Sequence, residues 1–410
     1  MIEASRTEQD HPTLRRSLTL PLLTLYGLGV TVGAGIYVLI GATVSQAGPF
    51  AWIAFLLAAV VVGFTALSYA ELATRYPVSA GEAVYVQSGF GRKSLATAIG
   101  CLVAISGMIS AAAITVGAAG YLAGLIGLPP NILIISIVVS MAMLAYWGIT
   151  QSVTVAATVT VIEILGLGFV IVWGMHFGGD GGLELSELIP VSGAIPWGAI
   201  FSASLLAFFA FVGFEDMVNV AEEVKEPRRT FPKAILITLA VATLLYVATC
   251  IAVLLSVPLD ALNTSNEPLA LVFSNAPQFV QSSFSTIAVV ATVNGVLIQM
   301  IMSSRVFYGM AARGQLPKVL ARLSTNTRTP SIATGFVALS ILALSLLLPI
   351  HQLAEWTSQI VLFVFVFVNA SLIAIKNGKK NGQTDHFSIP IFVPILGIIA
   401  SVALLSASLI

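Results

Sequence analysis

The sequence predicts an all-α integral membrane protein, on three observations. Hydrophobic residues make up 58% of the 410 residues and charged residues only 9%, against roughly a quarter in a typical soluble chain. The apolar residues gather in runs of about 20 or more, the length that a helix needs to cross a bilayer core. Lys and Arg lie at the ends of these runs or between them. A soluble globular fold is therefore excluded. Intrinsic disorder is excluded too, because the chain is strongly apolar and carries no net charge. Nucleic acid is a poor partner, because 18 acidic residues balance the 18 basic ones and leave no excess positive charge to neutralise phosphates.

Eleven apolar segments are predicted to span the membrane. Short polar stretches that contain Pro and Gly separate them and mark turns. The segments cover residues 18–42, 49–74, 94–125, 131–149, 152–177, 197–221, 231–257, 283–310, 331–350, 353–375 and 389–409.

The basic residues predict the orientation of these spans. Counting eleven spans places all 18 Lys and Arg residues on one side, and the opposite loops at 180–196 and 258–282 contain none. Lys and Arg collect in cytoplasmic loops. We therefore expect a cytoplasmic N-terminal segment at 1–17, and a multi-pass protein of a prokaryotic cytoplasmic membrane.

Glycines interrupt two spans at matching places. Span 1 reads GLGVTVGAGIYVLIG and span 6 reads FFAFVGFEDMVNVAEE, so that Gly33 and Gly213 are 180 residues apart. This spacing predicts an inverted repeat in which 18–177 and 197–376 are two five-helix copies and 389–410 is an additional peripheral helix. Spans 1 and 6 are then discontinuous helices, and interrupted helices in equivalent positions of two halves indicate a substrate site near the bilayer midplane.

The predicted breaks suit a zwitterionic ligand. Free N–H groups at the positive end of the outer half of span 1 would bind a carboxylate, while carbonyls that end the preceding half-helices would accept hydrogen bonds from an ammonium group. The first set is Gly33, Ala34, Gly35 and Ile36; the carbonyls lie near Val30 and Ala210, and Thr31 lies among the glycines. The alternative is that the glycines only allow helices to pack closely.

Four segments carry a resemblance to a known family. They are GAGIYVLIG in span 1, YPVSAGEAVYVQSGFG at 76–91, FFAFVGFEDMVNVAEEVKEPRRTFPKAI at 208–235, and SSRVFYGMAARGQLPKVLARLSTNTRTP at 303–330. The chain resembles the amino acid, polyamine and organocation permeases, whose fold is similar to the leucine-transporter type of 5 + 5 inverted repeat. The resemblance implies that Gly33, Ala34 and Gly35 bind the substrate carboxylate. It also implies that Phe209 forms an aromatic lid over the substrate, for which ordinary packing is the alternative, and that Glu215 acts in gating or proton sensing.

Span 5 departs from this family. Many members carry a Lys near the middle of that span, where this chain has Glu163. An unpaired carboxyl buried in a bilayer can take up and release a proton near neutral pH. Glu163 is therefore a candidate proton carrier or a ligand of a coupling cation, the alternative being a permanently protonated structural acid. In span 6 neighbouring side chains point in different directions, so that at most one of Glu215 and Asp216 is expected to face the site, and Glu215 is favoured. Glu71 is expected to pair with Arg75, Arg228 or Arg229.

These observations predict a secondary transporter that moves amino acids by alternating access, coupled to protons or acting as an exchanger. A polyamine or organic-cation permease of the same fold is the nearest alternative. A membrane enzyme is disfavoured because no HExxH or GxSxG motif is present, and a channel because no pore loop is visible. The expected partners are an amino acid, the lipid bilayer and a coupling proton or cation. We expect neither a cofactor nor a metal site, and the sequence carries no signal for oligomeric state.

Overall fold

The computed structural model describes residues 18–78, 81–147, 153–177, 182–189, 195–265, 267–324, 329–378 and 386–406. The predicted N-terminal segment 1–17 lies outside these residues, as do Arg328, Lys379 and Lys380. Helices form nearly all of the described part, where the β-pairing consists of an isolated bridge between Leu18 and Val224. Helices suit the apolar sequence because they satisfy every backbone polar group within one segment.

Each of the eleven predicted spans coincides with one helix or with a pair of helical segments. Span 1 is the pair α1 (Leu20–Thr31) and α2 (Ala34–Ala47), and span 6 is the pair α8 (Trp197–Phe209) and the 3₁₀ segment η3 (Phe214–Glu223). The prediction that both helices are discontinuous is therefore confirmed. The other spans are α3 (Ala51–Arg75), α5 (Lys93–Ile126), α6 (Pro130–Trp147), α7 (Val153–Phe177), α9 (Pro227–Ser256), α11 (Gln278–Ala312), α12 (Ser331–Leu347), α13 (Ile350–Asn377) and α14 (Phe392–Ser406).

Several short helices lie in the connections and were not predicted. The most consequential is α4 (Gly81–Phe90), which follows α3 and packs against α5 and α13. The others are α10 (Leu259–Thr264), η1 (Gly48–Phe50), η2 (Leu185–Leu188), η4 (Ala270–Phe273) and η5 (Lys318–Ala321).

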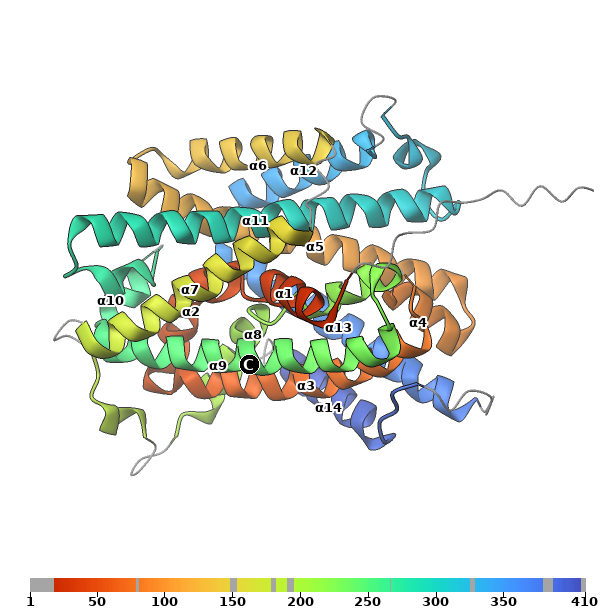
Figure 1. Ribbon diagram of the computed structural model, residues 1–410, viewed down its shortest axis with the longest axis horizontal. Coiled ribbons are helices and arrows are strands. Elements are labelled where there is room, and N and C mark those ends of the chain that lie inside the picture. Colours follow the sequence, from red (N-terminus) through yellow and green to blue (C-terminus); the bar gives the residue numbers. More distant parts are fainter. Residues whose placement is uncertain are drawn as a thin grey trace, which may run out of the picture.

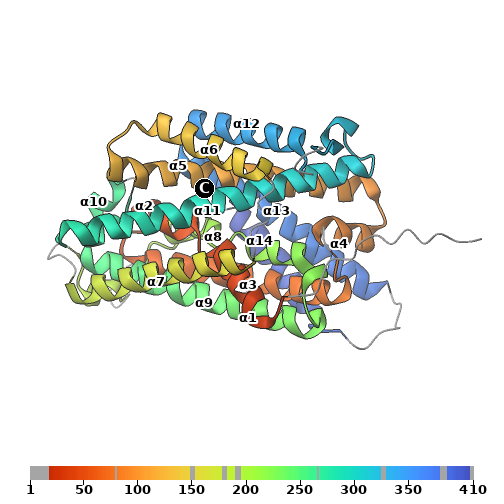
Figure 2. The ribbon, with the colours of Figure 1, turned by 45° about the horizontal axis from the view of Figure 1, so that its top comes forward.

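Helix packing has the symmetry of an inverted repeat. The long helices α3, α9 and α11 run along the longest axis of the molecule (Figure 1). The counterpart spans α3 and α9 pack together, as do α5 and α11, and α6 and α12 (Figure 2). Contacts between different spans also come in matching pairs, because α1 packs on α7 as α8 packs on α13, and α1 packs on α9 as α8 packs on α3. This pattern supports the 5 + 5 fold, while the residue bounds of the two repeats remain a prediction.

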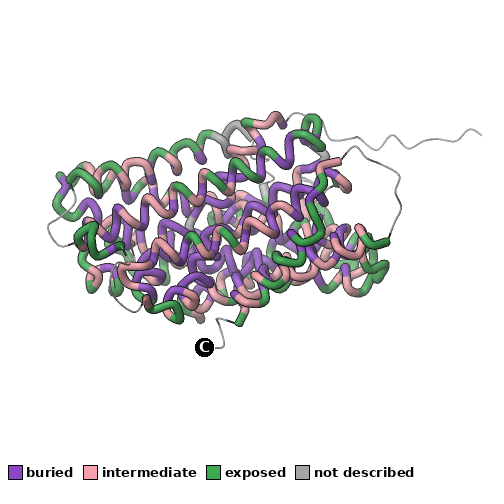
Figure 3. Tube along the Cα trace, turned by 90° about the horizontal axis from the view of Figure 1, so that it is seen from below, coloured by how far each residue is buried: buried purple, intermediate pink, exposed green. Residues whose placement is uncertain are grey.

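Buried residues fill the centre of the bundle and exposed residues follow its outer helices (Figure 3). Large apolar side chains are among the exposed ones, including Leu165 on α7, Leu244 on α9 and Leu339 on α12. Within the described residues, seven helical stretches are long and apolar enough to cross a membrane, and four further apolar helices are shorter. An apolar outer surface on such helices is what contact with lipid requires.

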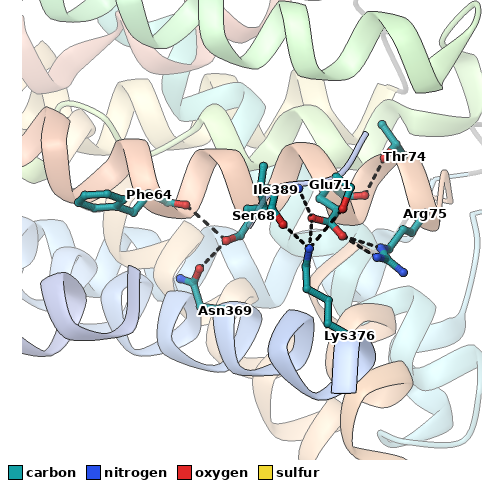
Figure 4. Close-up of polar contacts among 9 residues, drawn as sticks. Phe64, Ser68, Glu71, Thr74, Arg75, Asn369, Lys376 and Ile389 are labelled. Atoms are coloured by element: carbon teal, nitrogen blue, oxygen red, sulfur yellow. Dashed lines mark hydrogen bonds and ion pairs between the residues drawn. The ribbon is translucent and has the colours of Figure 1, made fainter. Parts of the chain in front are cut away.

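An ion-pair network joins the ends of α3 and α13. The fully buried Glu71 lies 2.6 Å from Arg75 Nη2 and 2.8 Å from Lys376 Nζ, and it accepts a 2.8 Å hydrogen bond from the backbone N–H of Ile389 (Figure 4). The predicted pairing of Glu71 with Arg75 is thereby confirmed. One turn earlier, Ser68 Oγ donates to Asn369 Oδ1 at 2.6 Å, so that a second polar contact joins the same two helices.

Candidate functional site

Span 1 is interrupted in the middle of the bundle. Helix α1 ends at Thr31, Val32 still donates a backbone hydrogen bond to Leu28, and α2 begins at Ala34 with Gly33 as its N-cap. The N–H groups in the first turn of a helix have no acceptor within that helix, and they lie at the positive end of its dipole. The start of α2 therefore offers hydrogen-bond donors to an anionic group.

Span 6 is interrupted at the same depth. Helix α8 ends at Phe209, a turn follows, and η3 begins at Phe214. Gly213 has φ of +124°, a conformation that strains residues with a Cβ atom. Its backbone N–H donates to Oε2 of Glu215 at 2.9 Å, so that this acid satisfies a donor freed by the break.

The two breaks touch each other. A Cβ atom on Gly35 would lie 2.4 Å from Cα of Ala210, and one on Gly213 would lie 2.7 Å from the carbonyl oxygen of Val30. Glycine at these two positions therefore lets the interrupted segments approach closely. The hydroxyl of Tyr246, on α9, lies 2.6 Å from the carbonyl oxygen of Thr31 and 2.7 Å from that of Ala210, and so bridges the two breaks.

A cavity lies where the breaks meet, and we name it the break cavity. Its wall combines residues of both breaks with residues of α5 and α11: Val30, Thr31, Gly33, Gly35, Ser110, Ile114, Phe209, Val212, Gly295, Ile298 and Gln299. Apart from Gly33 and its two neighbours in the chain, no described atom lies within 4 Å of the place that a Cβ on Gly33 would occupy, so Gly33 faces open space. A mostly apolar hollow with a few backbone and side-chain polar groups is typical of a small-molecule site.

Most of the predicted binding residues lie at this cavity. Val30, Thr31, Gly33, Gly35 and Phe209 line it. Three further candidates, Ile36, Ala210 and Gly213, are buried in or beside the breaks and are not among the lining residues. The backbone of Ala34 starts α2, whereas its side chain lies outside what the structure describes. The carbonyl of Ala210, expected to accept from a substrate ammonium group, already accepts from Tyr246.

A second cavity adjoins the first, and we name it the acidic cavity. It shares Ser110, Val212 and Gln299 with the break cavity, and three carboxyl side chains line it: Glu82 of α4 with Glu215 and Asp216 of η3. Neither acid of span 6 lines the break cavity. Both line the acidic cavity instead, where the first turn of η3 follows directly on the break. The expectation that Glu215 is the acid that acts at the substrate site stays a prediction.

Glu82 is held in an apolar surrounding. Its side chain is buried, and Oε1 accepts a 3.2 Å hydrogen bond from the hydroxyl of Tyr69. Burial raises the pKa of Glu82 above the ordinary value of 4.5, and the hydrogen bond from Tyr69 opposes this shift. Its negative charge is thus costly unless a positive group lies nearby.

Glu163 is buried on α7 and lines neither cavity. Its backbone carbonyl accepts a 2.9 Å hydrogen bond from the hydroxyl of Tyr37. The side-chain amide of Asn294, on α11, interacts with the carboxyl, although neither carboxyl oxygen has a hydrogen-bond partner of ordinary geometry among the described residues. The carboxyl also interacts electrostatically with Tyr246, the residue that bridges the breaks.

Tyr246, Gln299 and Glu82 are among the residues of the site that escaped the sequence analysis. Tyr246 and Gln299 are polar side chains within apolar spans, and polar residues inside a membrane commonly mark function, so this signal could have found them. Glu82 lies in a connection between spans, and nothing in the sequence indicates that α4 folds back to bury it.

The fold and the cavities define the class of protein. Two interrupted helices that meet around a cavity, in counterpart positions of two inverted halves, are the architecture of a secondary transporter. The sequence comparisons agree: the family model described as amino acid permease matches residues 18–410, and the chain belongs to this family. The protein is therefore a membrane transporter of amino acids and not an enzyme.

Individual relatives carry transporter names. The chain is 30% identical over 392 residues to a branched-chain amino acid permease of Bacillus subtilis, a match that covers 90% of this chain and 83% of the relative. It is also 30% identical to the vacuolar cationic amino acid transporter 4 of Arabidopsis thaliana, over 90% of this chain and 64% of the relative. The human cationic amino acid transporter 4 is 28% identical, with 90% and 61% covered. This chain thus spans less than two thirds of the length of these two cationic transporters.

Proposed function

We propose that the protein is a secondary transporter that binds the α-carboxylate and α-ammonium groups of an amino acid in the break cavity and moves them by alternating access. The observation that carries this proposal is the meeting of the two helix breaks around open space at Gly33. Donors at the start of α2 would bind the carboxylate, and the carbonyl of Val30, near the end of α1, would accept from the ammonium group. Phe209 would cover the substrate as an aromatic lid.

Coupling is assigned to Glu163. The acid is buried next to the breaks, with Asn294 and Tyr246 as interaction partners. A change in its protonation alters the electrostatic field at Tyr246, whose hydroxyl bridges the carbonyls of Thr31 and Ala210. Glu163 is thereby suited to couple proton uptake to the arrangement of the two breaks. As part of the same proposal, the protein resides in a prokaryotic cytoplasmic membrane with its N-terminus on the cytoplasmic side.

Counterflow in liposomes tests the proposed binding mode. Purified protein is exposed to radiolabelled amino acids and, in parallel, to their decarboxylated analogues, such as lysine against cadaverine and leucine against isoamylamine. We expect saturable exchange of amino acids, with the amines about 10- to 100-fold weaker because they lack the group that binds the N–H donors.

The other outcomes identify the rival functions. Equal exchange of the amines would contradict binding of a carboxylate at α2 and support an organic-cation permease. Conductance without saturation would support a channel.

A further inference from the structure

The acidic cavity has an unusual composition for the interior of an apolar bundle. Glu82, Glu215 and Asp216 are 4%, 7% and 4% exposed, and all three line it. Each accepts a hydrogen bond from an uncharged donor: Glu82 from Tyr69, Glu215 from the backbone of Gly213, and Asp216 from Gln299 Nε2 at 3.3 Å. None of the described residues that line the cavity is basic. The three acids therefore lack a cationic partner within the described wall.

Gln299 supplies an independent indication of a ligand. Its side chain is 5% exposed and lines both cavities, and its Oε1 atom is buried without a hydrogen-bond partner among the described residues. An unsatisfied buried acceptor costs about 1–3 kcal/mol. A ligand with N–H groups in the cavity would satisfy this oxygen.

The arrangement of acceptors favours an organic cation over a metal ion. Within the described residues, no group of three or more His, Cys, Asp or Glu side chains lies in position to hold a metal ion. The carboxyls come from α4 and η3, and the free amide oxygen comes from α11. Acceptors that come from three separate segments suit a group with several N–H donors, such as an ammonium or a guanidinium.

We propose that the acidic cavity binds the distal cationic group of the substrate side chain, so that basic amino acids are the preferred substrates. This inference rests on the proposed function, because it takes the carboxylate end of the substrate to lie at the start of α2. The shared wall of Ser110, Val212 and Gln299 places the two cavities side by side. An extended substrate reaches from Gly33 in one cavity to the carboxyls of the other, and its charge replaces the partner that they lack.

Arginine and citrulline provide the test, because citrulline has nearly the same shape and carries no side-chain charge. Counterflow in liposomes gives the apparent affinity for each, with leucine as a short neutral substrate. Charged hydrogen bonds to buried carboxylates predict that arginine binds about 10- to 100-fold more tightly than citrulline. In Glu82→Gln this preference should fall by about tenfold or more, while the affinity for citrulline is retained and reports a folded transporter.

Glu267→Gln is the matched control. Glu267 is a partly buried acid in the connection between α10 and η4, and it lines neither cavity. Its substitution should leave the preference for arginine unchanged. Asp216→Asn is the second variant, and it should reduce the preference for arginine in the same way as Glu82→Gln.

Each remaining outcome overturns the inference. If the wild-type protein has the same apparent affinity for citrulline or leucine as for arginine, the acidic cavity does not bind a cationic side chain, whether or not the variants fold. The proposed function stands in that case. If arginine is preferred and both variants retain that preference, the cationic group binds elsewhere. Sodium-dependent exchange with equal affinity for arginine and citrulline would assign the cavity to an inorganic cation. Equal apparent affinity of the wild-type protein for amino acids and for their decarboxylated analogues would reject the proposed function, and with it this inference.

Discussion

Single polar side chains connect the helix breaks to their surroundings. Tyr246 is the clearest case, because one hydroxyl lies within hydrogen-bond distance of carbonyls from both interrupted spans. In the proposed coupling mechanism, the buried Glu163 acts on the breaks through its electrostatic interaction with Tyr246. Its burial without a basic partner among the described ion pairs separates it from Glu71, which is fully paired.

The role of Glu163 can be tested by removing its ability to ionise. Glu163→Gln keeps the size of the side chain and its hydrogen-bonding capacity toward Asn294. Uptake driven by a pH gradient should collapse, because the proton has no carrier, whereas exchange of substrate without a gradient should persist. Both rates are measured with the same labelled amino acid in liposomes. Wild-type levels of pH-driven uptake in the variant would remove Glu163 from the coupling mechanism.

The interrupted segments combine tight packing with open space. Gly35 and Gly213 are required where backbone meets backbone, since a Cβ atom at either position would collide with the opposite break. Gly33 differs, because a Cβ atom there would project into the break cavity without touching a described atom. Gly35 and Gly213 therefore allow close packing, whereas Gly33 leaves room for a ligand, and substitutions can separate these two roles.

Gly33→Ala should affect mainly substrate affinity, and Gly213→Ala mainly thermal stability. The first should preserve thermal stability in detergent and weaken substrate affinity by about tenfold or more, because the methyl group blocks access to the N–H donors. The second should lower the melting temperature, since alanine is strained at a φ of +124° and crowds the carbonyl of Val30. Unaltered substrate affinity in Gly33→Ala would argue against binding of the substrate at the start of α2.

The two inverted halves are also linked by polar contacts. The Glu71 network joins α3 of the first half to α13 of the second and to the segment before α14 (Figure 4). The two helices that this network joins, α3 and α13, both pack on α8, which belongs to the span that contains the second break. The network therefore stabilises the arrangement of helices around the cavities.

Removing the charge of Glu71 should destabilise the whole molecule. Glu71→Gln leaves Arg75 and Lys376 without their shared buried partner, which typically costs about 3 kcal/mol or more. A lower melting temperature in detergent is the expected result. Glu226→Gln is the control, because Glu226 and Arg229 form an exposed pair at 3.9 Å, and such pairs contribute about 0–1 kcal/mol. Equal melting temperatures for both variants would show that the network adds little stability.

Much of the fold could be predicted because its signals are local. The apolar runs place the eleven spans, and the glycines at Gly33 and Gly213 mark both interruptions, since a lost side chain weakens a helix wherever it occurs. The same motifs indicate five of the residues that line the break cavity. These properties depend on neighbours in the chain, so the sequence by itself determined the class of protein, the spans and the breaks.

The tertiary structure alone decided which side chains meet. Glu82 joins Glu215 and Asp216 only because α4 packs back against α5 and α13, and Tyr246 reaches both breaks only because α9 lies beside α1. Helices in a bilayer are apolar on nearly every face, so hydropathy locates a span without revealing which face meets which neighbour. The physical reason is that lipid and protein interior are equally apolar, and only packing of specific shapes and polar groups distinguishes one contact from another.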